Sequence, residues 1–211
     1  MGLSGRRRSA ASNFGESELK PTTDDSHLIE QKLDSQEILK GNFLHAFRDT
    51  VRLPDGSSST REYVKHPGAV CMIPLLDDGR LVLERQYRWP MQRVMLEFPA
   101  GKIDPGEDRL ACAKRELLEE TGYTAREWAH AGQLHPVISY STEFIDLWFC
   151  RGLELQESRL DDEEFLEVIT ATPQELIEWC RDGTVTDAKT LVGCLWLQNI
   201  LSGAWKLDWR T

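Results

Sequence analysis

GKIDPGEDRLACAKRELLEETGY, the stretch from Gly101 to Tyr123, combines a glycine turn, an arginine and several glutamates in one spaced array. Glu116, Glu119 and Glu120 stand at positions i, i+3 and i+4, so on an α-helix their carboxylates project from one face. Like charges at these spacings destabilise an isolated helix by about 0.2–0.5 kcal/mol per pair unless cations neutralise them. Hard divalent cations such as Mg²⁺ bind through a few carboxylates together with substrate phosphates. The array therefore predicts a metal site, with a solvated acidic helix face as the alternative.

The rest of this stretch predicts a loop, a helix and a glycine that ends the helix. Gly101 allows a tight turn after the strand LEFPA, and Gly122 provides a left-handed helix end. Arg115 precedes Glu119 by four positions and is predicted to orient that carboxylate with its rigid donor fork. The helix is expected to bury the opposite stripe, which consists of Leu110, Ala113, Leu117 and Thr121.

These spacings match the Nudix box, G-x5-E-x7-R-E-U-x-E-E-x-G-U, in which U is a bulky apolar residue. The fixed positions are held by Gly101, Glu107, Arg115, Glu116, Leu117, Glu119, Glu120, Gly122 and Tyr123. Tyr123 is a soft match, because it is aromatic instead of aliphatic. The chain therefore resembles the Nudix hydrolases. For Glu107, a charge that complements the helix dipole and a direct metal contact both stay open.

Outside the box, the sequence alternates between strand and helix patterns. Runs typical of strands cover residues 37–53, 59–67, 69–88, 94–100, 125–136, 144–153 and 165–172. The turn PDGSS joins the first two runs into a hairpin, and DDG folds the third run into another. Helices are expected from Pro173 to about Arg181, with Thr172 as N-cap, and from Asp187 to about Leu201. The sum is an α/β (α+β) chain, and the resemblance implies the Nudix fold, a mixed β-sheet sandwiched between helices.

Three segments are predicted. Residues 1–30 are rich in Ser, Gly, Arg, Asp and Glu and lack an apolar run, so they are expected to be a disordered tail. Residues 31–65 resemble the small N-terminal β-hairpin arm with which the ADP-ribose pyrophosphatase branch of the Nudix hydrolases forms a domain-swapped homodimer. An isolated hairpin is marginal in water, so a second copy is its simplest partner. Residues 66–205 are expected to form the Nudix hydrolase domain.

Composition restricts the possible partners. The net charge of −10 disfavours nucleic acid, which needs a basic face to neutralise its phosphates. A membrane span is not expected, since no stretch approaches ~18 consecutive apolar residues. The five cysteines contain no C-x-x-C pair, which disfavours zinc and predicts reduced thiols in a cytoplasmic protein.

Two segments outside the box predict substrate contacts. In ERQYRWP, residues 84–90, Arg85 and Arg88 are predicted to share one strand face and to bind phosphate. This element is similar to the RQ-R element of the ADP-ribose pyrophosphatase branch, with solvated surface arginines as the alternative. Arg61 and Glu62 fall where that branch has a substrate-contacting pair that reaches into the partner subunit's site.

The loop HPVISYSTE, residues 135–143, is the third informative segment. In the same branch, a flexible loop at this distance from the box carries a glutamate that helps hold metal or activates the attacking water. Glu143 lies at the matching offset, and His135 is the alternative base. The marker proline of the branch would fall at Ile138, whereas this chain has Pro136.

The resemblance implies an enzyme that hydrolyses ADP-ribose to AMP and ribose 5-phosphate. The implied cofactor is Mg²⁺, with Mn²⁺ possible, bound by Glu116, Glu120 and the Ala100 carbonyl. Arg115, Glu119 and Glu143 are the predicted catalytic residues. The partners expected are a small nucleotide-sugar substrate and a second copy of the chain. The alternatives are a broader nucleoside diphosphate sugar hydrolase, a Nudix-fold ligand sensor and a structural scaffold.

Overall fold

The computed structural model describes residues 24–156 and 165–211. Most of the predicted disordered tail, residues 1–23, therefore lies outside the described residues. In chain order the elements are η1 (Ser26–Leu28), β1 (Gln31–Lys40), β2 (His45–Arg52), β3 (Ser58–Lys65), β4 (Ala69–Leu75), β5 (Leu81–Arg88), η2 (Trp89–Met91), β6 (Arg93–Glu97), β7 (Ala100–Lys102), α1 (Arg109–Thr121), β8 (Tyr123–Leu134), β9 (Ile145–Leu155), β10 (Leu166–Ala171), α2 (Pro173–Asp182) and α3 (Ala188–Leu201).

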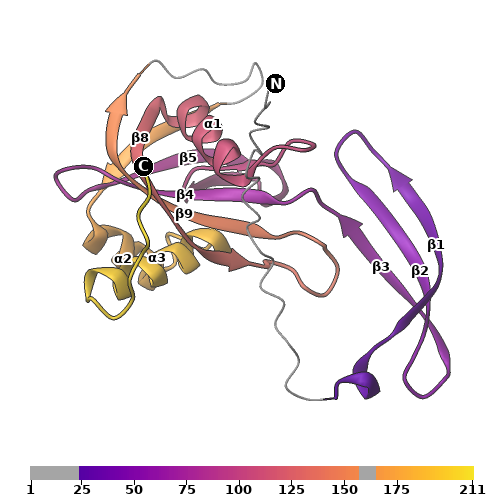
Figure 1. Cartoon of the computed structure of the whole chain (residues 1–211). Helices are drawn as coiled ribbons and strands as arrows, with labels where there is room; N and C mark the ends of the chain where they lie inside the picture. Colours follow the sequence, from indigo (N-terminus) through magenta and orange to yellow (C-terminus); the bar gives the residue numbers. More distant parts are fainter. Residues whose placement is uncertain (1–23, 157–164) are drawn as a thin grey trace, which may run out of the picture.

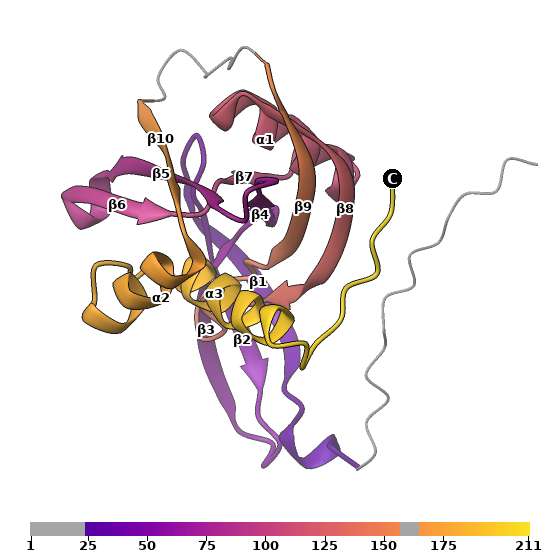
Figure 2. The same cartoon turned by 90° about the vertical axis from the view of Figure 1, so that its left-hand side faces the viewer.

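The central sheet is mixed and lies between helices. Its strands follow the order β10-β5-β4-β9-β8, with β6 paired to β5 and β7 paired to β4. Strand β4 runs parallel to β9 and antiparallel to β5 and β7. Helix α1 covers one face, and α2 and α3 cover the other (Figure 1 and Figure 2). The predicted sandwich of a mixed sheet between helices is confirmed.

Strand β4, AVCMIPL, supplies both hydrophobic cores. Successive side chains of a strand point to opposite faces, so a continuous apolar run suits a strand that is covered on both sides. The core beneath α2 and α3 includes Cys71, Ile73, Leu81, Leu83, Phe98, Leu147, Phe149, Leu176, Cys194 and Leu197. The core beneath α1 includes Val70, Met72, Cys112, Ala113, Leu117, Trp128, Trp148 and Cys150. All five cysteines of the chain are free.

The loop before α1, the helix itself and the glycine that ends it are all found as predicted. The Asp108 side chain caps its start by accepting hydrogen bonds from the amides of Leu110 and Ala111. Gly122 ends it with a φ of 73°, in the left-handed region that favours glycine. The predicted inward stripe is confirmed, although Leu110 is only half-buried.

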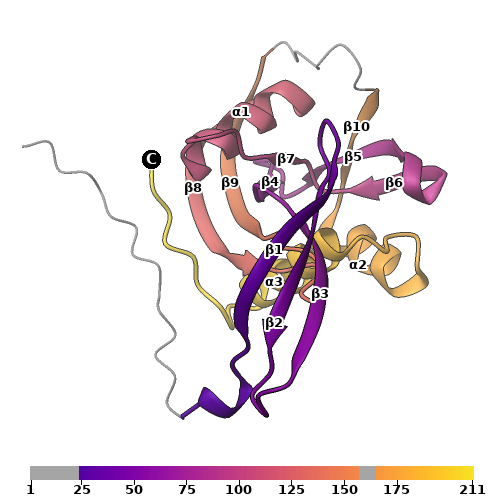
Figure 3. The same ribbon diagram turned by 90° about the vertical axis from the view of Figure 1, so that its right-hand side faces the viewer.

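The arm has three strands instead of the predicted hairpin. Residues 37–53 were expected to form one strand, but a turn splits them, and the amide of Gly41 donates to the Leu44 carbonyl at 2.8 Å. A Gly-Asn pair favours such a turn over a continuous strand. Strands β1, β2 and β3 form an antiparallel sheet that extends away from the body (Figure 1 and Figure 3). Strand β1 is exposed along its whole length, including Leu33, Ile38 and Leu39.

The run VMLEFPA, predicted as one strand, is also split. Its first part lies in β6 and pairs with β5, while its last residue begins β7 and pairs with β4. Strands β4 and β5 pair only between Leu75 and Leu81 and then diverge. The break between β6 and β7 places Glu97 and Ala100 in the wall of a cavity. The split therefore opens the sheet at the candidate site.

Both C-terminal helices begin where the sequence predicted. Thr172 and Glu175 form a capping box at the start of α2, and Asp187 caps α3. Within residues 24–156 and 165–211, no helix is long and apolar enough to span a membrane.

Candidate active site

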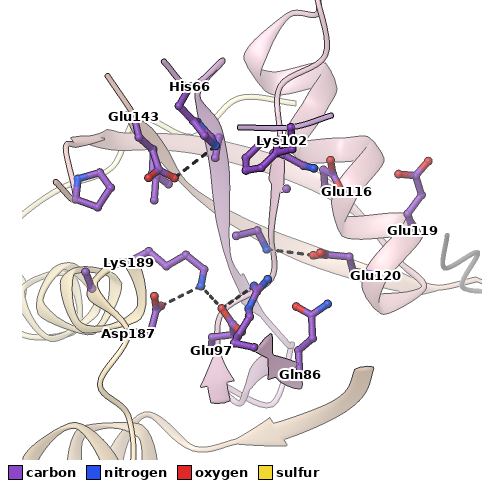
Figure 4. A pocket seen from close by; sticks show the side chains of 18 of the residues that line it. His66, Gln86, Glu97, Lys102, Glu116, Glu119, Glu120, Glu143, Asp187 and Lys189 are labelled. Atoms are coloured by element: carbon purple, nitrogen blue, oxygen red, sulfur yellow. Dashed lines mark hydrogen bonds and ion pairs between the residues drawn. The ribbon is translucent and has the colours of Figure 1, made fainter. Parts of the chain in front are cut away.

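A cavity of about 670 Å³ lies between α1 and the start of α3 (Figure 4). The arm's β1–β2 turn, the linker after β3, strands β5 to β7 and the loop before β9 also line it. It brings together most of the residues predicted for the site, namely Arg88, Ala100, Arg115, Glu116, Glu119, Glu120 and Glu143.

Arg115 binds three carboxylates at once. Its Nη1 donates to Glu116 at 2.8 Å and to Glu119 at 2.9 Å. Its Nε and Nη2 donate to the two oxygens of Glu107, both at 2.9 Å. The hydrogen bonds to Glu107, the charge of Glu116 and the hydrogen bonds to Glu119 and Glu116 raise the pKa of the guanidinium above its usual range, although burial opposes them. Arg115 thus contacts Glu119 as its spacing predicted, and two further glutamates besides.

Glu107 faces Arg115. Both of its oxygens accept from that guanidinium, and one also accepts from the amide of Asp104 at 3.1 Å. Arg115 lowers the pKa of Glu107 to about 2. Asp108 already caps α1. This geometry favours a role in holding Arg115 over either role that the sequence left open.

Glu116 lies directly against Gly101. A Cβ atom added at position 101 would come within 1.8 Å of the Glu116 Cδ, so the close approach requires glycine there. Glu120 is only 4% exposed and accepts a hydrogen bond from the amide of Ala100 at 3.1 Å. Strand β7 therefore fixes two glutamates of α1 at the cavity. The observed contact of Ala100 is through its amide, while the role of its carbonyl stays a prediction.

The donor set suits a hard divalent cation by its chemistry. Glu116, Glu119 and Glu120 offer carboxylate oxygens to one cavity, and such cations take oxygen ligands. Among the described residues, no group of three His, Cys, Asp or Glu side chains is arranged around a common point. The chemistry of these carboxylates therefore fits the ion, although the described residues do not present a complete set of ligands already arranged around one point.

The opposite wall carries an ion-pair chain that the sequence analysis missed. Arg88 donates to both oxygens of Glu97, at 2.7 and 2.9 Å, and Lys189 contacts the same carboxylate. Lys189 is 6% exposed and also binds Asp187 at 3.0 Å. Burial lowers its pKa, but Asp187 and Glu97 outweigh burial and hold the pKa above its ordinary value. A lone lysine in the apolar sequence of α3 was the available signal.

Arg85 and Arg88 do not share a strand face, so this prediction was wrong. Residues three apart on a strand point to opposite faces. Arg85 donates to Glu167 of β10 at 2.6 Å, outside the cavity lining. Gln86, two residues before Arg88, lines the cavity with it and was missed.

Arg61 and Glu62 lie on strand β3 of the arm, outside the cavity lining. Arg61 pairs with Glu30, and Glu62 accepts from Arg48 at 2.7 Å. Their predicted contact with substrate would therefore have to occur in another subunit's site.

Glu143 lies in the cavity lining and is half-buried. Its Oε1 is 3.9 Å from Nε2 of His66, a residue that the sequence analysis missed. His135, the alternative base, has its Nδ1 3.3 Å from the backbone oxygen of Glu143 and lies outside the lining. Pro136 lines the cavity, whereas Ile138 is 85% exposed.

The ion pair between Glu107 and Arg115 predicts a specific acid dependence of stability. Because folding lowers the pKa of Glu107 from 4.5 to about 2, its contribution is complete above pH 4.5 and is lost as the pH falls towards 2. Glu107→Gln should lower the free energy of unfolding at pH 7. The difference in free energy of unfolding between wild type and this variant should become smaller as the pH falls. Urea unfolding at a series of pH values measures this gap. Glu154→Gln, at an exposed position, is the control; a constant gap for Glu107→Gln would contradict the assignment.

Comparison with known proteins gives two family matches that together cover most of the chain. The NUDIX domain matches residues 65–191, and the nucleoside diphosphate sugar hydrolase N-terminal domain matches residues 30–64. The boundary between them falls at the end of β3, where the arm meets the body.

Individual relatives agree with these matches. The chain is 34% identical to the ADP-ribose pyrophosphatase of Bacillus subtilis (strain 168), over 81% of this chain and 94% of that protein. It is 36% identical to the methanol dehydrogenase activator of Bacillus methanolicus, over 81% of this chain and 94% of that protein. A crystal structure of an ADP compounds hydrolase superposes with a TM-score of 0.76 at 21% identity, over 83% of this chain and 95% of that chain, which shows the shared fold. The chain belongs to the Nudix hydrolase family, with the N-terminal domain of nucleoside diphosphate sugar hydrolases.

Proposed function

We propose that this protein hydrolyses the pyrophosphate bond of ADP-ribose to give AMP and ribose 5-phosphate, with Mg²⁺ as the metal and Mn²⁺ as a substitute. The observation that carries this proposal is the two-sided cavity, with the α1 carboxylates on one wall and the Arg88–Glu97–Lys189 chain on the other. The family generally uses a divalent metal. The relative from Bacillus subtilis, named an ADP-ribose pyrophosphatase, supports the choice of substrate.

Glu116 and Glu120, with Glu119 and the Ala100 carbonyl as further candidates, would hold the metal. A divalent cation bound there would neutralise phosphate charge and make a nearby water more acidic. Phosphoryl transfer depends mainly on positioning and charge neutralisation, with little covalent help from the protein. The acidic wall of the cavity therefore supplies what the reaction most needs once the cation is present.

The other residues bind and orient. Arg88 is fixed by Glu97 and offers its remaining N–H groups to a phosphate oxygen. Arg115 holds the α1 carboxylates in place. Glu143 accepts a proton from the attacking water, whose oxygen forms a bond to one phosphorus. The bond from that phosphorus to the bridging oxygen breaks, and the other phosphate leaves with its nucleoside or sugar.

A broader nucleoside diphosphate sugar hydrolase is the second candidate. It is favoured by the match of residues 30–64 to the N-terminal domain of nucleoside diphosphate sugar hydrolases, which names a wider substrate class. A ligand sensor that had lost catalysis would not need Glu116, Glu119 and Glu120 in one cavity. A substrate panel distinguishes the two enzymatic candidates.

The test is hydrolysis of ADP-ribose, nucleotide sugars, NADH, dinucleoside polyphosphates and nucleoside triphosphates with Mg²⁺, scored by the nucleotide products released, which is AMP for ADP-ribose. ADP-ribose should give the highest kcat/KM. Glu120→Gln keeps the shape of the side chain but removes a charged ligand, so kcat should fall by about 10²-fold or more with an unchanged thermal midpoint. Glu154→Gln is the matched control at an exposed position. Near-normal turnover of Glu120→Gln at saturating Mg²⁺ would refute the metal assignment, and preference for another sugar would favour the second candidate.

The proposal includes a homodimer joined by the arm. The arm projects from the body, and its exposed strand β1 carries Leu33, Ile38 and Leu39, which a second copy would cover. Arg61 and Glu62 lie outside the cavity of their own chain, as expected of residues that serve the partner's site. The dimer thus gives these two residues a route to substrate.

Subunit mixing tests this arrangement. Glu120→Gln and Arg61→Ala chains should each be nearly inactive, but a heterodimer of the two has one intact site if Arg61 acts across the interface. Co-expressed and randomly paired, they should recover about a quarter of wild-type activity. Deleting residues 1–30 should leave an active dimer. No recovery on mixing, or an active monomer by light scattering, would contradict the shared site.

A further inference from the structure

His66 lies in the linker between β3 and β4 and is held in one orientation. Its Nδ1 accepts a hydrogen bond from the amide of Gly68 at 3.1 Å. Gly68 has a φ of 98°, and a Cβ atom there would come within 2.3 Å of the Phe144 ring, so the backbone that presents this amide requires glycine at position 68. A ring nitrogen that accepts carries no proton, so the proton of the neutral imidazole is on Nε2.

The protonated Nε2 faces Glu143. The distance from Nε2 to the Glu143 Oε1 is 3.9 Å, and the two side chains point toward each other across the cavity wall (Figure 4). This is longer than a hydrogen bond, as is common for catalytic contacts before substrate binds. The side chain of His66 is 10% exposed and that of Glu143 is 27% exposed, so solvent only partly screens the pair.

The surroundings of His66 lower the pKa of its ring below the ordinary value. Burial lowers its pKa, Glu143 opposes this effect, and Lys102 adds to it. The Phe43 ring meets the imidazole edge-to-face, with 5.5 Å between the ring centroids, and the Lys102 ammonium lies over the Phe43 ring, 4.6 Å from its centroid. Phe43 belongs to the β1–β2 turn, so the arm itself packs on His66.

The backbone of the linker also holds the loop that carries Glu143. The amide of His66 donates to the Thr142 Oγ1 at 2.9 Å, and the amide of Thr142 donates to the Val64 carbonyl at 3.0 Å. The amide of Val64 donates in turn to the Tyr140 carbonyl at 2.8 Å. The loop is therefore tied to the end of strand β3 immediately before Glu143.

We infer that His66 is a positioning residue for Glu143, whose carboxylate it directs into the cavity through its Nε2–H. The backbone hydrogen bonds fix the position of the loop before β9, and the imidazole orients the carboxylate of Glu143 at the end of that loop. This inference rests on the proposed role of Glu143 as the group that accepts the proton of the attacking water. The linker between β3 and β4, which joins the arm to the body, would then also contribute to the reaction through His66.

Two substitutions distinguish the roles of the two ring nitrogens of His66. Glutamine can place its side-chain amide near the position of Nε2 and still reach Glu143. Asparagine can replace Nδ1 as the acceptor from Gly68 but is too short to reach Glu143. His66→Asn should lower kcat by about tenfold or more with KM nearly unchanged, because a small misplacement of a reacting group is costly in the transition state. His66→Gln should restore most of kcat.

A double-mutant cycle with Glu143→Gln completes the experiment. If His66 acts through Glu143, then His66→Asn should cause little further loss of kcat in the Glu143→Gln background. Thermal midpoints of the His66 variants should match each other, which separates positioning from folding. Full kcat of His66→Asn, an equal loss for His66→Gln, or an undiminished loss in the Glu143→Gln background would overturn the inference alone. Full kcat of Glu143→Gln would instead overturn the proposed role of Glu143 and the inference with it.

Discussion

The guanidinium of Arg115 neutralises a helix surface that would otherwise repel itself. Glu116 and Glu119 lie on the same helix, and Glu107 lies just before it, yet one arginine binds all three. Its fork of donors can satisfy several carboxylates in fixed directions, which a lysine could not do. With these charges compensated, α1 can place its acidic face on the cavity while its apolar face closes the core around Leu117.

The break between β6 and β7 gives this acidic wall an opposite wall. Glu97 ends β6 and binds both Arg88 and Lys189, so two cations are held where the sheet opens. Lys189 and Glu97 are both buried, and breaking a buried ion pair by removing one partner is strongly destabilising, so this pair also links β6 firmly to α3. A cavity with fixed cations on one side and carboxylates on the other is suited to a diphosphate that arrives together with a divalent cation.

Much of this architecture could be predicted from local patterns. The box predicted α1 and the glycine that ends it, Thr172 was correctly predicted as the N-cap of α2, and Asp187, predicted as the first residue of the last helix, is the residue that caps α3. The failures have local causes as well. A turn at Gly41 inside a run of strand-like residues concealed a third strand of the arm, and the two-residue period of β5 was misapplied to Arg85.

The missed site residues depend on contacts between distant parts of the chain. Lys189 joins the site because the start of α3 brings it to Glu97 at the end of β6, and His66 joins it because the loop before β9 pairs with the end of β3. A single motif contains no information about such neighbours. Arg61 and Glu62 depend on a further step, since their predicted contact with substrate involves a second copy of the chain.

The central claim is that the carboxylates of α1 form a divalent cation site. Titration with Mn²⁺, followed by electron paramagnetic resonance of the free ion, tests this directly and does not depend on which substrate is used. The wild-type chain should bind Mn²⁺ saturably, and Mg²⁺ should compete. Glu120→Gln should weaken this binding by about tenfold or more, while Glu154→Gln should not. Equal binding by the wild-type and Glu120→Gln chains would contradict the claim.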